Sequence, residues 1–248
     1  DLGRVHVWNN VPEYLQRVVV DGETVRSERI VAGEVGKQTA IFSRPMRRIT
    51  FRPTWKVPDS IKVRELWPSL LRGGGLMREW ALEVYTKDGQ PRDWRKMDWA
   101  TTDIREFDVI QPNGPKSVLG KVKFSFPNPH TIFMHDTMER DKYMFNLSRR
   151  TFSHGCMRVR NPMELAQILL KADKGWDADH VAELYQNGPM NNEIVLDQKI
   201  PVHVPYFTAM VADAGRLATF PDVYGHERRI SQALEGKWER IAKGRDHL

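Results

Sequence analysis

The stretch "TFSHGCMRVRN", Thr151–Asn161, contains Cys156, the only cysteine of this 248-residue chain. A lone cysteine is most often a small buried apolar residue. The residues around this one are polar and include a glycine, unlike those of a core strand, and they favour a reactive thiol. Gly155 lets the backbone turn sharply, so that the amides of Gly155 and Cys156 can converge on one point, as an oxyanion hole requires.

A cysteine becomes a strong nucleophile when a neighbouring base takes its proton. His154 is adjacent in sequence, but adjacent side chains seldom meet in an extended segment. His135 ends the strand-like run "TIFMH" and precedes Asp136. A histidine at a strand end can face a loop that returns beside the same sheet, so we expect His135 to be the base.

A metal site built from His135, His154 and Cys156 is the alternative reading of these residues. A structural zinc site usually has four ligands with local Cys and His spacing, and the remaining histidines are isolated in sequence. We therefore expect neither a metal nor another cofactor.

Short strand-like runs dominate the chain and predict a β-rich α+β fold. Asp21-Gly22 stands between two such runs and predicts a hairpin. After the cysteine segment, Asn161 and Pro162 are typical of a helix N-cap and first position. A second helix is expected between Asp177 and Gly188.

Composition changes between Pro58 and Ile110, where four of the eight tryptophans fall: Trp67, Trp80, Trp94 and Trp99. We interpret this stretch as an insertion with its own small hydrophobic cluster. "GGG" at Gly73–Gly75 interrupts its helix-like run and is either a hinge or a turn.

The formal net charge is +6. This fits an ordinary basic surface or an anionic partner. Lys and Arg are scattered, without a dense arm, which argues against nucleic acid as the partner. No apolar run is long enough to span a membrane, and a single cysteine excludes an intrachain disulfide. No signal sequence is visible, and the chain opens inside a strand-like pattern, so we expect upstream residues to be missing.

The spaced motif resembles the active-site segment of the YkuD-type L,D-transpeptidases: His135, a spacer, then Ser153, His154, Gly155, Cys156, Met157 and Arg158. "FRPTWKVPDSI" and "VIQPNGPKSVLGKVKFSFPNPHTIFMHDT" are similar to the large periplasmic branch of that family, which has a capping subdomain. "PYFTAMVADAGRLATFPDVYGHE" resembles the C-terminal extension of that branch. The resemblance covers nearly the whole chain and is loosest in the insertion.

The resemblance implies a curved β-sandwich core with a helix after the nucleophile loop. Residues 1–248 would form the catalytic domain, with 59–110 inserted as a capping lid. Residues 206–248 would form a C-terminal extension packed on the core.

The resemblance also implies roles for individual residues. Cys156 would be the nucleophile and His135 the general base, oriented by the backbone of Asp136. His154 and Gly155 would shape the oxyanion loop. The substrate-binding residues would be Phe133, Ser153 and Arg158, the last being either structural or a carboxylate-binding group.

The implied reaction joins peptidoglycan stem peptides. Cys156 would attack the bond after diaminopimelate, release the terminal D-amino acid and form a thioester, which an amine of a second stem would resolve. A carbapenem-type β-lactam would acylate the same sulfur. The expected location is the periplasm of a Gram-negative bacterium.

Two alternatives stay open: an L,D-carboxypeptidase, in which water resolves the thioester, and a non-catalytic wall-binding module. The acceptor amine also stays open between diaminopimelate, the first-position L-alanine and a protein lysine.

Overall fold

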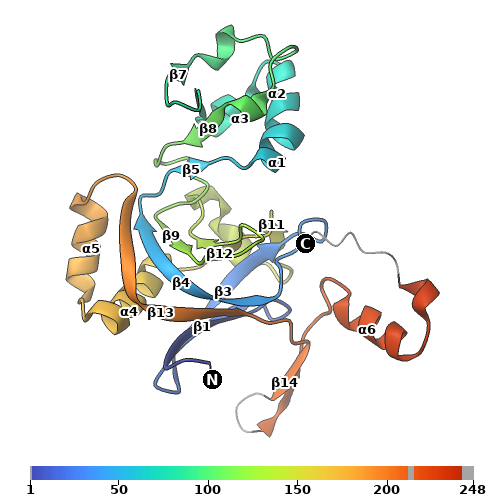
Figure 1. Ribbon diagram of the computed structural model, residues 1–248. Helices are drawn as coiled ribbons and strands as arrows, with labels where there is room; N and C mark the ends of the chain where they lie inside the picture. The colour runs from blue at the N-terminus through green and yellow to red at the C-terminus, as the bar shows by residue number, and fades with distance from the viewer. Residues whose placement is uncertain (1, 212–214, 242–248) are drawn as a thin grey trace.

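Residues 2–211 and 215–241 are described by the computed structural model, and their largest element is a nine-stranded sheet. The strand order is β11-β3-β12-β10-β9-β4-β13-β1-β2, and a further pairing of β2 with β3 closes the sheet on itself. The β-rich prediction is confirmed (Figure 1). The strands are β1 (Val5–Asn10), β2 (Leu15–Val20), β3 (Glu23–Gly33), β4 (Phe42–Phe51), β9 (Val122–Ser125), β10 (Met134–His135), β11 (Thr151–Ser153), β12 (Met157–Val159) and β13 (Asn192–Val204).

The hairpin expected at Asp21-Gly22 joins β2 to β3. Val20 pairs with Glu23, which leaves a loop of two residues. The φ angles of Asp21 and Gly22 are 53° and 86°. A two-residue turn with positive φ at both positions matches the right-handed twist of the strands, so this prediction is confirmed.

Two helices follow the nucleophile segment, as the sequence predicts: α4 (Pro162–Lys174) and α5 (Ala178–Asn187). Helix α4 buries one apolar stripe in the main core, formed by Leu165, Ala166, Leu169 and Leu170. The side chain of Asp177 accepts a hydrogen bond from the His180 backbone N–H at 2.8 Å and caps α5, and Gly188 follows its last residue.

Asn161 occupies the predicted N-cap position of α4, and the helix begins at Pro162 as expected. Asn161 adopts a left-handed conformation, with φ 49°, and its side chain makes no cap hydrogen bond. Its Nδ2 atom instead donates to Glu28 Oε1 at 2.6 Å. The left-handed backbone turns the chain from β12 into α4 and directs the amide toward β3.

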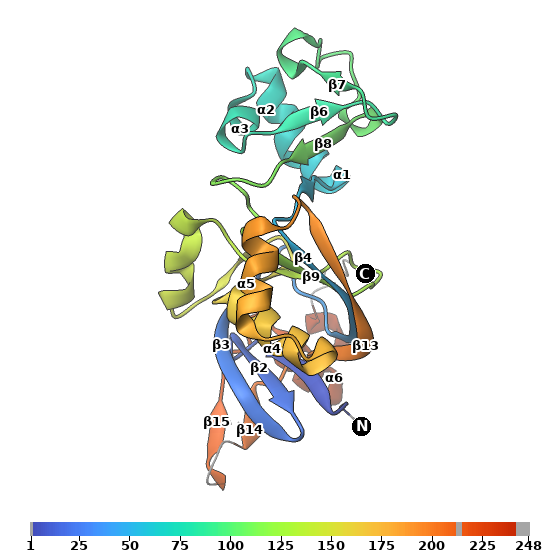
Figure 2. The ribbon, with the colours of Figure 1, turned by 90° about the vertical axis from the view of Figure 1, so that its left-hand side faces the viewer.

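Residues 55–111 form a second sheet with the order β5-β8-β6-β7, and short helices pack on it. The predicted insertion, 59–110, lies within these residues, which stand beyond one end of the main sheet in two perpendicular views (Figures 1 and 2). The elements are β5 (Trp55–Lys56), α1 (Asp59–Ile61), η1 (Lys62–Leu66), α2 (Trp67–Leu71), α3 (Gly75–Glu79), β6 (Glu83–Tyr85), β7 (Pro91–Arg92), η2 (Trp94–Lys96), η3 (Ile104–Glu106) and β8 (Asp108–Gln111).

The insertion has a hydrophobic cluster separate from the main core, and Trp94 and Trp99 are buried in it. The glycine run makes a turn between α2 and α3. Gly74 has φ 71°, and a Cβ atom there would lie 2.3 Å from the Trp94 ring. The turn brings the backbone against the indole, so a side chain at this position is excluded.

The chain beyond β13 forms a hairpin, β14 (Ala209–Val211) with β15 (Leu217–Thr219), then α6 (His226–Leu234) and η6 (Trp238–Arg240). Tyr224 joins this extension to the main core, because its ring is buried there. The Tyr224 hydroxyl donates to the Gly33 carbonyl at 2.7 Å and accepts from the Thr39 N–H at 3.2 Å. Residues 212–214 and 242–248 of the predicted extension lie outside the described residues.

We predict that Tyr224→Phe lowers the free energy of unfolding by about 1–3 kcal/mol, because the buried carbonyl of Gly33 and N–H of Thr39 lose their partner. Urea denaturation measures this change. Tyr143→Phe is the control, since Tyr143 is 59% exposed, and it should change stability by less than about 0.5 kcal/mol. Equal losses in the two variants would contradict the anchoring role.

Candidate active site

Strands β10 and β12 lie side by side in parallel; His135 ends β10, and Cys156 directly precedes β12. Met134 pairs with Met157, and both side chains are fully buried in the core. Side chains alternate along a strand, so His135, next to Met134, faces away from that core, and Cys156, next to Met157, continues the same alternation. The pairing thus places the two residues on one face of the sheet.

The Cys156 side chain is half-buried on this face. Its Sγ atom lies 3.9 Å from the Thr131 carbonyl oxygen, a long and weak contact. Burial raises the pKa of the thiol to about 11, although the backbone N–H of Phe133 and the charge of Lys123 act in the opposite direction. The thiol is therefore protonated at neutral pH in this structure.

His135 is 7% exposed, and its Nδ1 atom lies 2.5 Å from the carbonyl oxygen of Asp136. A carbonyl only accepts, so Nδ1 carries the proton in the neutral ring. Burial and the positive charge of Arg158 together lower the pKa of His135 to about 3, although the backbone groups of Asp136 and Val118 act in the opposite direction. Within the described residues, no hydrogen bond joins this ring to the Cys156 thiol.

Cysteine and histidine are therefore both neutral at rest. A preformed thiolate–imidazolium pair would require the opposite order of their pKa values. The arrangement suits a general base that takes the proton as the sulfur attacks.

The Asp136 carboxyl group holds the loop that covers His135. Its Oδ2 atom accepts from the Lys121 N–H at 2.8 Å, and Oδ1 is buried without a partner among the residues described. Burial raises the pKa of this carboxyl. Gly120, with φ +59°, packs directly against it, since a Cβ atom there would lie 2.4 Å from Oδ2.

The nucleophile loop is held by hydrogen bonds within the fold. The Ser153 hydroxyl donates to the Cys156 carbonyl and accepts from the Gly155 N–H. The Gly155 carbonyl accepts from the Thr39 hydroxyl at 2.8 Å. The Gly155 amide is thus occupied, whereas the Cys156 amide has no partner in the described part of the chain and is the one available to an oxyanion.

His154 points away from Cys156 and contacts the insertion. Its Nε2 atom lies 2.6 Å from Glu65 Oε1, and Lys37 Nζ lies 3.2 Å from the same oxygen. Burial alone would raise the pKa of Glu65, but the hydrogen bonds from His154 and Lys37 outweigh it and hold that pKa below its ordinary value. Glu65 belongs to η1, a single π-helical turn, and such turns are frequent at functional sites.

Arg158 shares the face of Cys156 but is already paired. Its Nη1 atom lies 3.3 Å from Asp141 Oδ2 and 3.1 Å from Met144 Sδ, both in η4 (Glu139–Asn146). Of the two roles expected for Arg158, the geometry favours the structural one.

Sequence reasoning missed Lys123, which pairs with His135 across β9 and β10 and so faces the same side. Its Nζ atom lies 5.4 Å from the centroid of the Phe133 ring, which is 5.5 Å from the His135 ring. The alternation of "KVKFSF", with Val122 and Phe124 buried, already directs Lys123 away from the core.

A sequence comparison identifies the chain. Residues 4–202 match the model of the YkuD L,D-transpeptidase catalytic domain. The chain belongs to this family. A curated Haemophilus influenzae protein, provisionally named an L,D-transpeptidase, is 26% identical over 237 residues. That similarity covers 96% of this chain and 47% of the relative, so the YkuD chain spans about half the length of the curated protein it matches.

Solved structures of L,D-transpeptidases are also similar. L,D-transpeptidase 3 of Mycobacterium tuberculosis has a TM-score of 0.37 and 11% identity, covering 82% of this chain and 61% of that one. The Enterococcus faecium catalytic domain acylated by ertapenem has a TM-score of 0.35 and 12% identity, covering 79% and 98%. Membership in the YkuD family rests on the sequence match and not on these scores.

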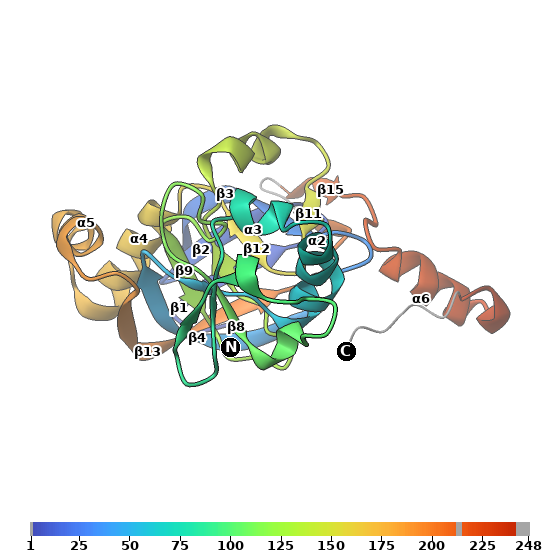
Figure 3. The same cartoon turned by 90° about the horizontal axis from the view of Figure 1, so that it is seen from above.

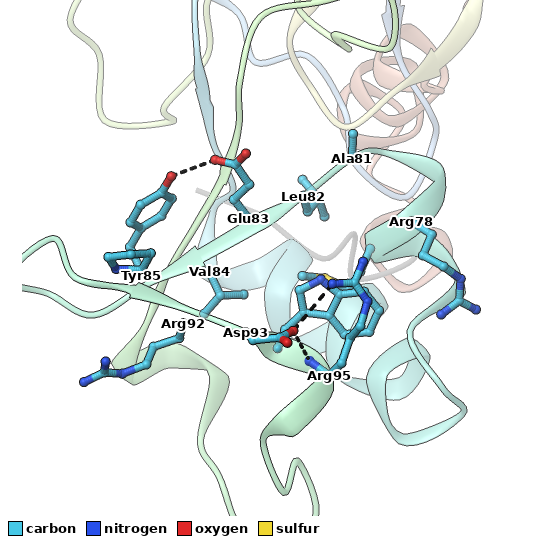
Figure 4. Close-up of a pocket in the computed structure, with 12 residues that line it drawn as sticks. Arg78, Ala81, Leu82, Glu83, Val84, Tyr85, Arg92, Asp93 and Arg95 are labelled. Carbon is cyan, nitrogen blue, oxygen red and sulfur yellow. Dashed lines mark hydrogen bonds and ion pairs between the residues drawn. The ribbon is translucent and has the colours of Figure 1, made fainter.

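The insertion of this YkuD chain contains a hollow of about 670 Å³, none of whose lining residues is a predicted site residue (Figure 4). Two polar contacts lie along its wall: the Tyr85 hydroxyl donates to Glu83, and Arg95 contacts Asp93. The Arg95 guanidinium also lies 4.7 Å from the Trp94 ring centroid. These contacts belong to the internal packing of the insertion.

Within residues 2–211 and 215–241, no three His, Cys, Asp or Glu side chains gather as metal ligands would. None of the helices in these ranges combines the length and the apolar character needed to cross a bilayer.

We predict that Gly120→Ala disturbs both stability and the site, because the new Cβ atom must displace the Asp136 carboxyl and strain a left-handed residue. The free energy of unfolding should fall by about 1–3 kcal/mol, and the His135 ring should lose its fixed position. Urea denaturation and the His135 imidazole resonances in NMR report the two effects. Gly114→Ala is the control, with open space around its Cβ position, and an equal response from it would refute the explanation.

We predict that Glu65→Gln loosens the contact between the insertion and the nucleophile loop. Amide hydrogen exchange in residues 59–71 and 151–156 should accelerate about two- to fivefold at pH 7, corresponding to the usual contribution of up to about 1 kcal/mol from a partly exposed pair. Because the pKa of Glu65 is depressed in the folded state, this stabilisation is present above the ordinary pKa of about 4.3 and lost as pH falls through the lower folded value. Variant and wild type should therefore converge at pH values below the folded-state pKa of Glu65.

Glu79→Gln is the control for this exchange experiment. Glu79 lies on the same insertion and contacts Arg140 of η4 at 2.9 Å. It should leave exchange in residues 151–156 unchanged. Acceleration there by Glu79→Gln would show that loss of any ion pair of the insertion loosens the nucleophile loop. It would contradict a specific role for Glu65.

Proposed function

We propose that this chain is the catalytic domain of a peptidoglycan L,D-transpeptidase that uses Cys156 as nucleophile and His135 as general base. The observation that carries the proposal is the pairing of β10 with β12, which brings His135 at the end of β10 beside the residue that precedes β12, Cys156, with Nδ1 of His135 bound to the Asp136 carbonyl. A non-catalytic wall-binding module would have no need for this pair.

The reaction follows from the neutral resting state. As Sγ attacks the carbonyl carbon of diaminopimelate in a stem tetrapeptide, its proton passes to His135 Nε2. The imidazolium then protonates the departing amine of the terminal D-amino acid, which leaves a thioester on Cys156. An amine of a second stem attacks this thioester, gives its proton to His135, and the sulfur leaves as the product forms.

Transition-state charge falls on the carbonyl oxygen in both steps. The unoccupied N–H of Cys156 is the donor we propose for it. His154 supports the loop that holds this amide, through its contact with Glu65. Arg158 and Phe133 lie on the same face of the sheet as His135. Ser153 holds the turn of the nucleophile loop.

The acceptor decides between two outcomes of one intermediate. Transfer to an amine makes a cross-link, and attack by water makes the protein an L,D-carboxypeptidase. In the view from above, the insertion overlies β9, β11 and β12 in projection (Figure 3). In Figure 1 the insertion stands beyond one end of the main sheet. We propose that it acts as a lid, and that exclusion of water by the lid favours the amine.

The proposed substrate places the protein in the periplasm. Family membership further supports carbapenem-type β-lactams as acylating inhibitors, since such a compound presents a carbonyl to the same sulfur. The match covers 47% of the curated relative. The proposal concerns only the domain that this chain forms.

We predict that a carbapenem adds one acyl mass to the wild-type protein and none to Cys156→Ala. His135→Gln should slow acylation by about 10²–10⁴-fold, the usual contribution of a general base. Intact-protein mass spectrometry measures both. His180→Gln is the matched control: His180 lies on α5 with its ring edge-on to Trp176, and the variant should acylate at the wild-type rate. An adduct on Cys156→Ala would remove Cys156 from the mechanism.

Incubation with purified disaccharide-tetrapeptide separates the candidate functions. A cross-linked dimer supports transpeptidation, a tripeptide without dimer shows a carboxypeptidase, and unchanged substrate with retained binding to sacculi shows a wall-binding module. Fragmentation of the dimer identifies the acylated amine.

A further inference from the structure

Lys123 is a half-buried cation without a carboxylate partner among the residues described. Glu193 is the acid whose charge reaches it, but Glu193 already pairs with Arg48 at 2.9 Å. Burying an ammonium group without a counter-charge costs free energy. The resting structure offers no interaction that offsets this cost fully.

The register of the sheet places Lys123 beside the reacting groups. It pairs with His135 on one side and with Thr50 on the other. Its ammonium group lies over the ring of Phe133, and the backbone N–H of that same residue faces the Cys156 sulfur. Phe133 is thus in contact with both Lys123 and Cys156.

The other charged groups near this face are already engaged. Arg158 pairs with Asp141 on η4, and His154 pairs with Glu65 on η1. His135 is neutral, with Nδ1 bound to a backbone carbonyl. Lys123 therefore remains as the cation that can respond when the sulfur acquires charge.

We propose that Lys123 is a positioning cation for Cys156: its ammonium group stabilises the negative charge that the sulfur acquires when its proton moves to His135. The charge of Lys123 also acts to lower the pKa of Cys156. Burial lowers the pKa of Lys123 itself, and the charges of Glu193 and of a Cys156 thiolate act in the opposite direction. The inference rests on the proposed role of Cys156 as nucleophile. Lys123 transfers no proton and forms no bond to substrate.

The test is the pH dependence of iodoacetamide alkylation, which follows the thiolate fraction. Cys156 is the only cysteine, so the reagent reports on a single thiol. In Lys123→Met the alkylation rate at pH 7–8, where the ammonium group of Lys123 is charged, should fall about tenfold, the usual effect of removing a nearby opposite charge. As the pH rises and Lys123 loses its proton, the two rates should converge.

Lys123→Arg keeps the charge and should retain most of the wild-type rate at pH 7–8. Lys121→Met is the matched control from the same stretch, since its ammonium group lies over Tyr185 instead, and its rate should not change. Lys123→Gln is the second variant if Lys123→Met fails to fold, as judged by its thermal unfolding. An unchanged rate in a folded, uncharged variant would overturn the proposal, as would equal losses in Lys123→Arg and Lys123→Met.

Kinetics with the tetrapeptide add a second readout. A positioning role for the thiolate lowers kcat for acylation at pH 7 and leaves KM near the wild-type value. A raised KM with an unchanged alkylation rate would instead make Lys123 a substrate-carboxylate site and refute the proposal. Alkylation needs no peptide, so a lowered alkylation rate in a protein without transpeptidase activity would fault the proposed function and leave the role of Lys123 standing.

Discussion

The parallel pairing of β10 with β12 is the constraint on which the site depends. It places Met134 beside Met157 inside the core. As a consequence, His135 and Cys156 both point away from the core. A slip of one residue on either strand would send the nucleophile or the base into the core, because side chains alternate with a period of two. The strands are short, and the ring closed by β2 and β3 holds them in register from both sides.

The electrostatics of the site oppose ionisation at rest. Burial raises the pKa of Cys156 and lowers that of His135, so both groups stay neutral. The fold compensates with fixed dipoles and one cation: the Phe133 N–H toward the sulfur, the Asp136 carbonyl on Nδ1, and Lys123 across the strand. These groups are in place before substrate arrives, which is the condition under which electrostatic stabilisation is most effective.

The sequence allowed much of this arrangement to be predicted, and the failures have physical causes. The hairpin at Asp21-Gly22 and helices α4 and α5 follow from local chemistry and are confirmed. Asn161 is the N-cap residue, as predicted, but its left-handed backbone and its bond to Glu28 depend on how β12 meets α4 and could not be predicted locally. Strand alternation in the sequence places Lys123 on the side away from the core, although it was not predicted as a site residue. Glu65 could not be found, because its partner His154 is 89 residues away and they meet only when the insertion docks.

The Glu65 contact has a consequence for how such a domain can vary. The insertion touches the nucleophile loop through one acid on one π-helical turn, while its outer sheet has a separate core. Strands β6 and β7 and the loops between them are therefore free to change in length and composition without altering the catalytic face. Position 65 is not free in this sense: replacing its carboxylate removes the partner of His154, while Lys37 keeps Glu34 at 3.2 Å, so a domain that loses this acid must also accommodate His154.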